Sequence, residues 1–126
     1  MVTLSREGEA PGPVITGFTA HGFRCDGEEY RDGLLLTPEW ARAWDAPDFD
    51  DLDRASFGDL IAIDPRPEFL LLGTGGVLRR PAARLVAALE ASEIGIEPMD
   101  SRAAARSWGM LRGEGRWIVA ALLPFD

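Results

Sequence analysis

Hydrophobic and polar residues alternate over short runs in the first part of the chain, which is the pattern of β-strands. Residues 14–20 alternate in this way and predict a first strand. Asp26 and Gly27 separate two further short runs and give a strong hairpin-turn signal. Another apolar run begins at Leu34, directly after Gly33. The sequence therefore predicts an antiparallel meander that ends near residue 40.

Residues 37–44 fit two structures. Thr37 is suited to cap a short helix, and Pro38 is suited to its first position. Trp40 and Trp44 would then lie on one helix face, because residues four apart are neighbours there. In the alternative, the preceding strand continues and ends near Trp44. We favour a turn or a single helical turn.

Residues 45–53 hold five aspartates and predict an exposed acidic loop. Their spacing differs from that of a calcium loop, since the central Gly and the distal bidentate Glu are missing. We therefore expect no metal site there. Residues 53–63 predict a helix with one apolar face, which Pro65 and Pro67 end.

The pattern after residue 67 is clearer, because wholly apolar runs alternate with amphipathic stretches. From Ala82, apolar residues recur at i, i+3, i+4 and i+7, which is the buried stripe of a helix. The predicted elements are strands at 69–72, 94–97 and 117–123, and helices from about Pro81 and over 101–112. This βαβαβ order implies an α/β domain. The loops after residues 72 and 98 then meet at the carboxyl edge of the sheet, where small-molecule sites concentrate.

Length and composition predict one domain. The chain has 126 residues, of which 46% are hydrophobic and 27% charged. Residues 1–13 predict a disordered or extended tail, and residues 14–126 the single α/β domain. No apolar run approaches membrane-spanning length, and no secretory signal stands at the start. We therefore expect a cytoplasmic protein without membrane insertion.

The charge and the rare residue types exclude several chemistries. The net charge is −8 and every basic residue is an arginine, so nucleic acid is disfavoured and no Schiff-base lysine exists. Cys25 and His21 are the single cysteine and histidine. Multi-Cys/His metal sites and intrachain disulfides are therefore excluded, and we expect no cofactor.

Three blocks of sequence together resemble one known family. They are 67–75 (PEFLLLGTG), 94–101 (IGIEPMDS) with AAAR at 103–106, and 114–116 (EGR) leading into VAALLP at 119–124. Residues 15–18 and 34–36 agree more loosely. The family is a group of small domains of unknown function (Mth-type hypothetical proteins) that includes the mitochondrial complex I assembly factor 3.

The resemblance implies a three-layer α/β domain with a mixed central sheet, preceded by a β meander. It implies no catalytic residue. Because the mitochondrial members act by binding proteins, it implies a non-enzymatic interaction or assembly-type module.

Gly73, Thr74, Gly75 and Gly76, here called the glycine turn, follow the first buried strand. Glycines allow close approach of the backbone to an anion, and Arg79 or Arg80 would add charged donors. A strand-to-helix connection that needs positive φ explains the same glycines. The turn is neither a P-loop nor a dinucleotide fingerprint. We favour the structural explanation.

Four further residues are candidates. Asp100 and Ser101 are expected near the glycine turn, where Asp100 would orient a ligand or act as a base, or either residue would cap the next helix. Trp40 or Trp44, beside the acidic loop, would anchor a partner or pack beneath that loop. Trp108 and Trp117 fit the core.

Two functions follow from these candidates. The leading hypothesis is an interaction module whose surface near residues 37–53, or at the glycine turn, meets a protein partner or a second copy. The alternative is a small-molecule or anion site at the glycine turn, which requires a concave pocket there.

Overall fold

The computed structural model describes residues 11–125. The strands are β1 (Ile15–Phe18), β2 (Phe23–Cys25), β3 (Glu28–Tyr30), β4 (Leu34–Leu36), β5 (Ala41–Ala43), β6 (Phe69–Gly73), β7 (Gly95–Met99) and β8 (Val119–Leu122). The helices are α1 (Gly58–Ile61), α2 (Ala83–Glu90) and α3 (Ser101–Gly113), with 3-10 turns at Phe49–Asp51 and Arg54–Phe57. None of the helices within these residues is long and apolar enough to cross a membrane.

The centre of the fold is a mixed five-stranded sheet in the order β5-β4-β8-β6-β7. Strand β6 runs parallel to both β7 and β8, while β4 pairs antiparallel with β8 and β5. The predicted βαβαβ unit is confirmed, with β8 at the centre of the sheet. The parallel pairing brings the carboxyl ends of β6 and β7 to one edge, as the sequence predicts, and the end of β8 meets them there.

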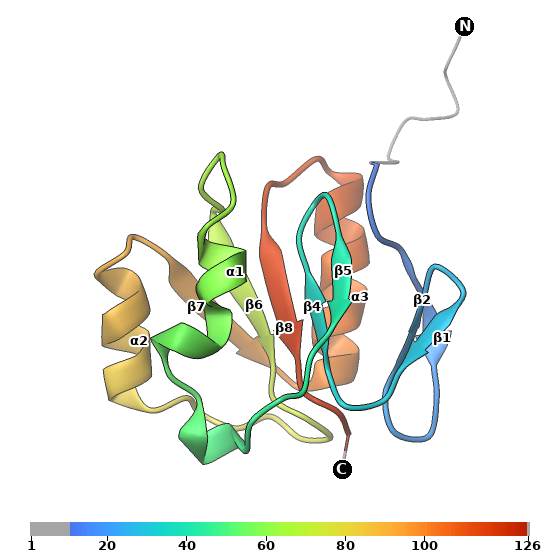
Figure 1. Cartoon of the computed structure of the whole chain (residues 1–126), viewed down its shortest axis with the longest axis horizontal. Coiled ribbons are helices and arrows are strands. Elements are labelled where there is room, and N and C mark those ends of the chain that lie inside the picture. The colour runs from blue at the N-terminus through green and yellow to red at the C-terminus, as the bar shows by residue number, and fades with distance from the viewer. Residues whose placement is uncertain (1–10, 126) are drawn as a thin grey trace, which may run out of the picture.

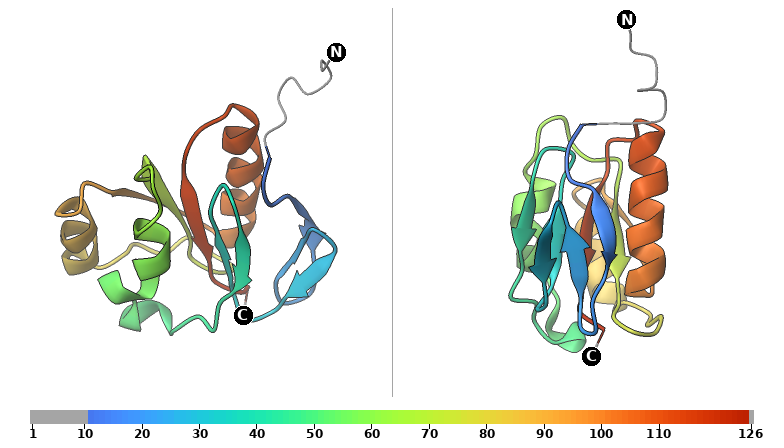
Figure 2. Two further views of the ribbon diagram at one scale, coloured as in Figure 1. Left: turned by 45° about the horizontal axis from the view of Figure 1, so that its top comes forward. Right: turned by 90° about the vertical axis from the view of Figure 1, so that its right-hand side faces the viewer.

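Helices cover both faces of this sheet and form three layers (Figure 1, Figure 2). Helices α1 and α2 pack on one face and α3 on the other. Alternate residues of β6 divide between the two cores: Leu70 and Leu72 lie toward α2, and Leu71 lies toward α3. Trp108 of α3 is fully buried in the second core. Because all of these positions are apolar, the central strands read as continuous hydrophobic runs.

The predicted meander is split between two sheets. Strands β1, β2 and β3 form a small antiparallel sheet of their own. The turn of the β2–β3 hairpin is made by Asp26 and Gly27, whose φ values are 50° and 89°. The expectation that the meander continues through Leu34 is wrong. The chain turns at Gly33, whose φ is 135°, and β4 joins the central sheet beside β8.

The turn favoured within residues 37–44 is confirmed at 37–40, where the Thr37 hydroxyl accepts from the N–H groups of Glu39 and Trp40 at 3.1 and 3.0 Å, and the short strand β5 follows it. Two helix boundaries differ from the prediction. Helix α2 begins at Ala83 rather than at Pro81, because Ala82 keeps an extended conformation. The predicted 53–63 helix is a 3-10 turn followed by the short α1.

The start of the described chain lies against α3. The Nε1–H of Trp108 donates to the carbonyl of Pro13 at 3.3 Å, and the Arg112 guanidinium donates to the carbonyl of Pro11 at 3.2 Å. These residues belong to the tail predicted over 1–13, of which residues 1–10 lie outside the described residues. The folded unit therefore includes Pro11 and Pro13.

Candidate functional site

The side chain of Thr74 closes the loop that follows β6. Its hydroxyl donates to the carbonyl of Val77 at 2.7 Å and accepts from the N–H of Arg79 at 3.0 Å. The N–H of Thr74 itself donates to the carbonyl of Met99 at the end of β7, at 2.8 Å. Thr74 is only 3% exposed. One buried threonine thus holds the backbone of the 74–79 loop in place at Val77 and at Arg79.

Close packing or backbone conformation explains each of the three glycines of the glycine turn. A Cβ atom on Gly73 would lie 2.7 Å from the Ser101 Oγ, and one on Gly76 would lie 2.8 Å from the carbonyl oxygen of Phe125. Gly75 has φ of 103°, a conformation that strains any other residue. Helix α3 and the C-terminal segment therefore approach this backbone too closely for side chains.

Asp100 and Ser101 lie beside the glycine turn, as their strand order predicts. Asp100 is the N-cap of α3, and its carboxylate accepts from the N–H of Ala103 at 2.9 Å. The fully buried Ser101 hydroxyl accepts from the N–H of Gly75 at 2.8 Å and donates to the carbonyl of Leu123 at 2.7 Å. Ser101 therefore joins the ends of β6 and β8 to the start of α3.

These bonds leave the turn few donors for an anion. The N–H groups of Thr74, Gly75 and Arg79 all donate within the protein. The Arg79 guanidinium lies 4.3 Å from the centre of the Phe49 ring and 3.6 Å from an oxygen of Asp50. Its charge is therefore already shared with the neighbouring acidic loop.

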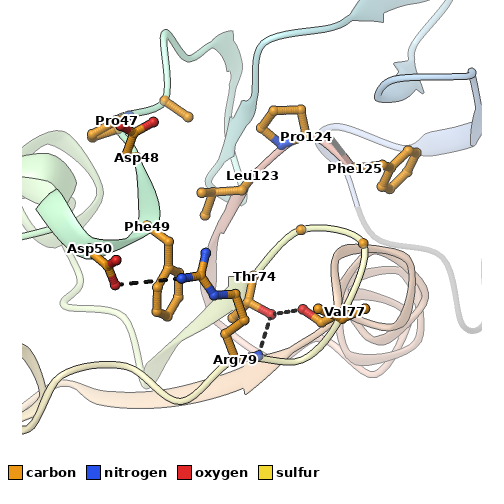
Figure 3. A pocket seen from close by; sticks show the side chains of 13 residues that line it. Pro47, Asp48, Phe49, Asp50, Thr74, Val77, Arg79, Leu123, Pro124 and Phe125 are labelled. Carbon is orange, nitrogen blue, oxygen red and sulfur yellow. Dashed lines mark hydrogen bonds and ion pairs between the residues drawn. The ribbon is translucent and has the colours of Figure 1, made fainter.

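A concave surface does lie at this edge, and we call it the edge hollow. It has a volume of about 510 Å³. Its lining comes from three segments, 46–50 of the acidic loop, 74–77 with Arg79, and 123–125 after β8. Figure 3 shows Phe49 and Asp50 on one side, Leu123 and Pro124 at the top, Val77 and Phe125 toward the other side, and the Arg79 side chain beside Phe49. The acidic loop and the glycine turn, two separate candidates in the sequence, thus border one hollow.

The rim of the edge hollow carries exposed apolar side chains. Val77 lines the hollow and is 67% exposed, and the adjacent Leu78 is 63% exposed. Val77 and Leu78 thus place two neighbouring exposed apolar side chains on a loop that Thr74 holds by hydrogen bonds. The opposite wall is polar, since Asp48 and Asp50 are both exposed.

The remaining candidates lie outside this lining. Trp44 is 8% exposed and packs against Phe57 in the core, with ring centres 6.1 Å apart. Trp40 is half-buried, packs against the same core, and is covered by the Arg42 guanidinium 3.8 Å above its ring. Arg80 lines a separate, smaller hollow with Pro81 and other residues. Trp44 offers little surface to a partner.

The single thiol is not placed for chemistry at this edge. Cys25 is 1% exposed, and burial, together with the neighbouring Asp26 carboxylate, raises the pKa of its thiol to about 11. Within residues 11–125, no group of three or more His, Cys, Asp or Glu side chains is arranged to hold a metal ion.

Comparison with known proteins extends this picture to relatives. The family described as "Protein of unknown function (DUF498/DUF598)" matches residues 15–123. The chain belongs to this family. The match confirms the resemblance drawn from the three sequence blocks, and it covers both sheets and all three helices.

The relatives of this chain include proteins with a named role. The chain is 37% identical to an uncharacterised Rhodobacter capsulatus protein over 87% of its own length and 83% of the relative's. It is 26% identical to the human NADH dehydrogenase [ubiquinone] 1 alpha subcomplex assembly factor 3 over 98% of its length, and 24% identical to the Drosophila melanogaster protein over 90%. It spans 67% and 59% of those two proteins.

Solved structures of DUF498/DUF598-like chains have the same fold. A crystal structure of a Bordetella parapertussis protein superposes with a TM-score of 0.81 at 27% identity, covering 92% of this chain and 98% of that one. A solution structure of a Bordetella pertussis protein, described as a Mth938-like domain, gives 0.76 at 26% identity, covering 90% and 86%. The expected three-layer fold with a mixed sheet is confirmed.

Sequence reasoning missed three parts of the edge hollow, namely Phe49, Val77 and the segment 123–125. The position of Leu123 was foreseeable, because β8 is parallel to β6 and ends at the same edge. Phe49 was not, since nothing in the acidic loop indicates which part of the sheet it crosses.

Proposed function

We propose that this chain is a non-enzymatic protein-binding module of assembly type, and that a partner docks over the edge hollow. The observation that carries the proposal is the apolar rim of this hollow. Val77 is 67% exposed, yet the loop that carries it is anchored by the buried Thr74 hydroxyl. An exposed apolar residue on a loop already held by hydrogen bonds, beside a concavity, is suited to docking, because a pre-ordered loop loses little entropy on binding.

The relatives support a protein partner. The human and Drosophila proteins are named as assembly factors of NADH dehydrogenase. The chain spans only part of their length, so the identity of their partners is not carried over. A different protein, or a second copy of this chain, would occupy the same surface.

Charge and composition support the other parts of the proposal. A net charge of −8 disfavours nucleic acid as the partner. The cytoplasmic location expected from the sequence stays a prediction.

Affinity purification of the tagged chain from its native cells tests the proposal, using Val77→Ser. Burying a valine contributes about 1.5–3 kcal/mol, so this variant should retain roughly tenfold less of a specific partner. Val14→Ser is the matched control. Val14 is 53% exposed, directly precedes β1 of the small sheet, and does not line the edge hollow. Equal recovery of the same proteins by both variants would contradict the proposal. So would a wild-type chain that recovers no partner and sediments as a monomer.

A small-molecule or anion site is the second candidate. Its support is the volume of about 510 Å³ at the carboxyl edge of the sheet, within the roughly 300–1,000 Å³ of ligand pockets. The Arg79 guanidinium is the cation at this hollow. Titration with inorganic phosphate, followed by the amide resonances of residues 74–79, tests this candidate. Saturable shifts that Arg79→Gln abolishes would support it, and unchanged resonances would exclude phosphate as the ligand.

A further inference from the structure

Three charged side chains line the edge hollow, and their arrangement favours a cationic group as the ligand. They are the Asp48 and Asp50 carboxylates and the Arg79 guanidinium. Arg79 is already engaged by Asp50 and by the Phe49 ring. The Asp48 side chain makes no capping bond to the 3-10 turn that it precedes. A carboxylate is therefore the charge that this wall presents to an incoming group.

The backbone at the hollow offers an anion a reduced set of donors. An anionic ligand needs N–H groups directed at it, and three of those in residues 74–79, of Thr74, Gly75 and Arg79, are consumed by internal hydrogen bonds. The chain as a whole carries a net charge of −8, and five aspartates lie in residues 45–53 alone. Long-range attraction therefore favours a cationic partner.

The floor and the opposite rim are apolar. Leu123 and Pro124 lie above Thr74 in the view of Figure 3, Phe49 lies on one side, and Val77 and Phe125 lie toward the other. A side chain that enters over Leu123 and Val77 meets carbon atoms, while the Phe49 and Phe125 rings are covered by the guanidinium groups of Arg79, at 4.3 Å, and Arg102, at 3.8 Å. The space of about 510 Å³ is large enough for one or two side chains.

We propose that the edge hollow takes a short segment of a partner protein in which apolar side chains are flanked by Lys or Arg. The apolar side chain lies over Leu123 beside Val77, and the basic side chain pairs with the Asp48 carboxylate. This inference rests on the proposed docking function and adds the chemistry of the partner.

Three acetylated, amidated tetrapeptides test the proposal by titration into the isotope-labelled full chain. Their sequences are Arg-Leu-Phe-Arg, Glu-Leu-Phe-Glu and Arg-Ser-Ser-Arg. The first should shift the amide resonances of residues 75–78 and bind at least about fivefold more tightly than either of the others. Its affinity should fall with added salt.

Two variants isolate the carboxylate. Asp48→Asn should weaken binding of the basic apolar peptide by about two- to fivefold, the worth of one exposed ion pair. Asp51→Asn is the matched control, since Asp51 is an exposed aspartate of the same loop that does not line the hollow. Equal loss in both variants, or none in Asp48→Asn, would overturn the pairing. Tighter binding of the acidic peptide would overturn the charge preference, as would binding of none of the three.

The two proposals fail separately. If no peptide binds while Val77→Ser still loses its cellular partner, the partner chemistry is wrong and the docking surface stands. If the basic apolar peptide binds while Val77→Ser keeps every partner, the hollow has the inferred preference and the docking function is wrong.

Discussion

Replacing Ser101 by Ala removes the hydroxyl that joins three segments of the fold. That hydroxyl accepts from the N–H of Gly75 at 2.8 Å and donates to the carbonyl of Leu123 at 2.7 Å. Both hydrogen bonds are buried, and Ser101 itself is 0% exposed. The substitution leaves one backbone donor and one backbone acceptor inside the protein without this partner.

The magnitude follows from these two groups. A buried backbone group that loses its partner costs about 1–3 kcal/mol. Alanine has a better helix propensity than serine, which returns roughly 0.5 kcal/mol at this first position of α3. Two such groups cost about 2–6 kcal/mol together, so we expect the free energy of unfolding to fall by about 1.5–5.5 kcal/mol. That is a large part of the roughly 5–15 kcal/mol of a typical domain.

Urea unfolding, followed by tryptophan fluorescence, measures this loss because Trp108 is fully buried. With a slope of about 2 kcal/mol per molar, the middle of the usual range, the midpoint should fall by roughly 1–3 M. Ser107→Ala is the control on the same helix, since the Ser107 hydroxyl donates to the Met99 sulfur, a weak acceptor, at 3.3 Å. A Ser101→Ala loss below about 1 kcal/mol, or equal to that of the control, would refute the reasoning.

Three further predictions concern stability and reactivity. Gly73→Ala should destabilise the chain by about 1–3 kcal/mol in the same unfolding assay, because the added Cβ would collide with α3. Gly109→Ala is the control and should stabilise the chain by about 0.5–1 kcal/mol, because the space around Gly109 is open. Cys25 should react with Ellman's reagent only when the chain unfolds; its contribution to stability is fully present below pH 9.0 and is lost as pH rises through about 11. Hydrogen bonds from Arg116 and a backbone N–H lower the pKa of Glu68 below 4.5. Glu68→Gln should therefore destabilise the chain at pH 7, and the difference from wild type, measured by urea unfolding, should shrink as pH falls below that value.

The strands and helices of the second half could be predicted because each has a strong local pattern. Leu70, Leu71 and Leu72 form an apolar run between breakers, and Asp100 is a good N-cap in front of an amphipathic stretch. Parallel pairing then requires the ends of β6 and β7 to meet. The closeness of the glycine turn and Ser101 follows from that rule alone.

The parts that could not be predicted depend on contacts between distant segments. The sequence does not tell which partner β4 chooses, because its three leucines suit either sheet. Trp117, expected in the core, is half-buried, and its Nε1–H donates to the carbonyl of Pro65 at 2.6 Å. The path of the acidic loop past Arg79 likewise depends on tertiary packing, so the edge hollow was visible only in the structure.

Photo-crosslinking from position 77 tests the docking surface most directly. A benzoyl-phenylalanine replaces Val77 in one chain and Val14 in another, and both chains are irradiated in the native cells. The account predicts that position 77 crosslinks to one protein, through a segment rich in apolar and basic residues, and that position 14 does not. Crosslinks to the same proteins from both positions, or none from position 77, would contradict it.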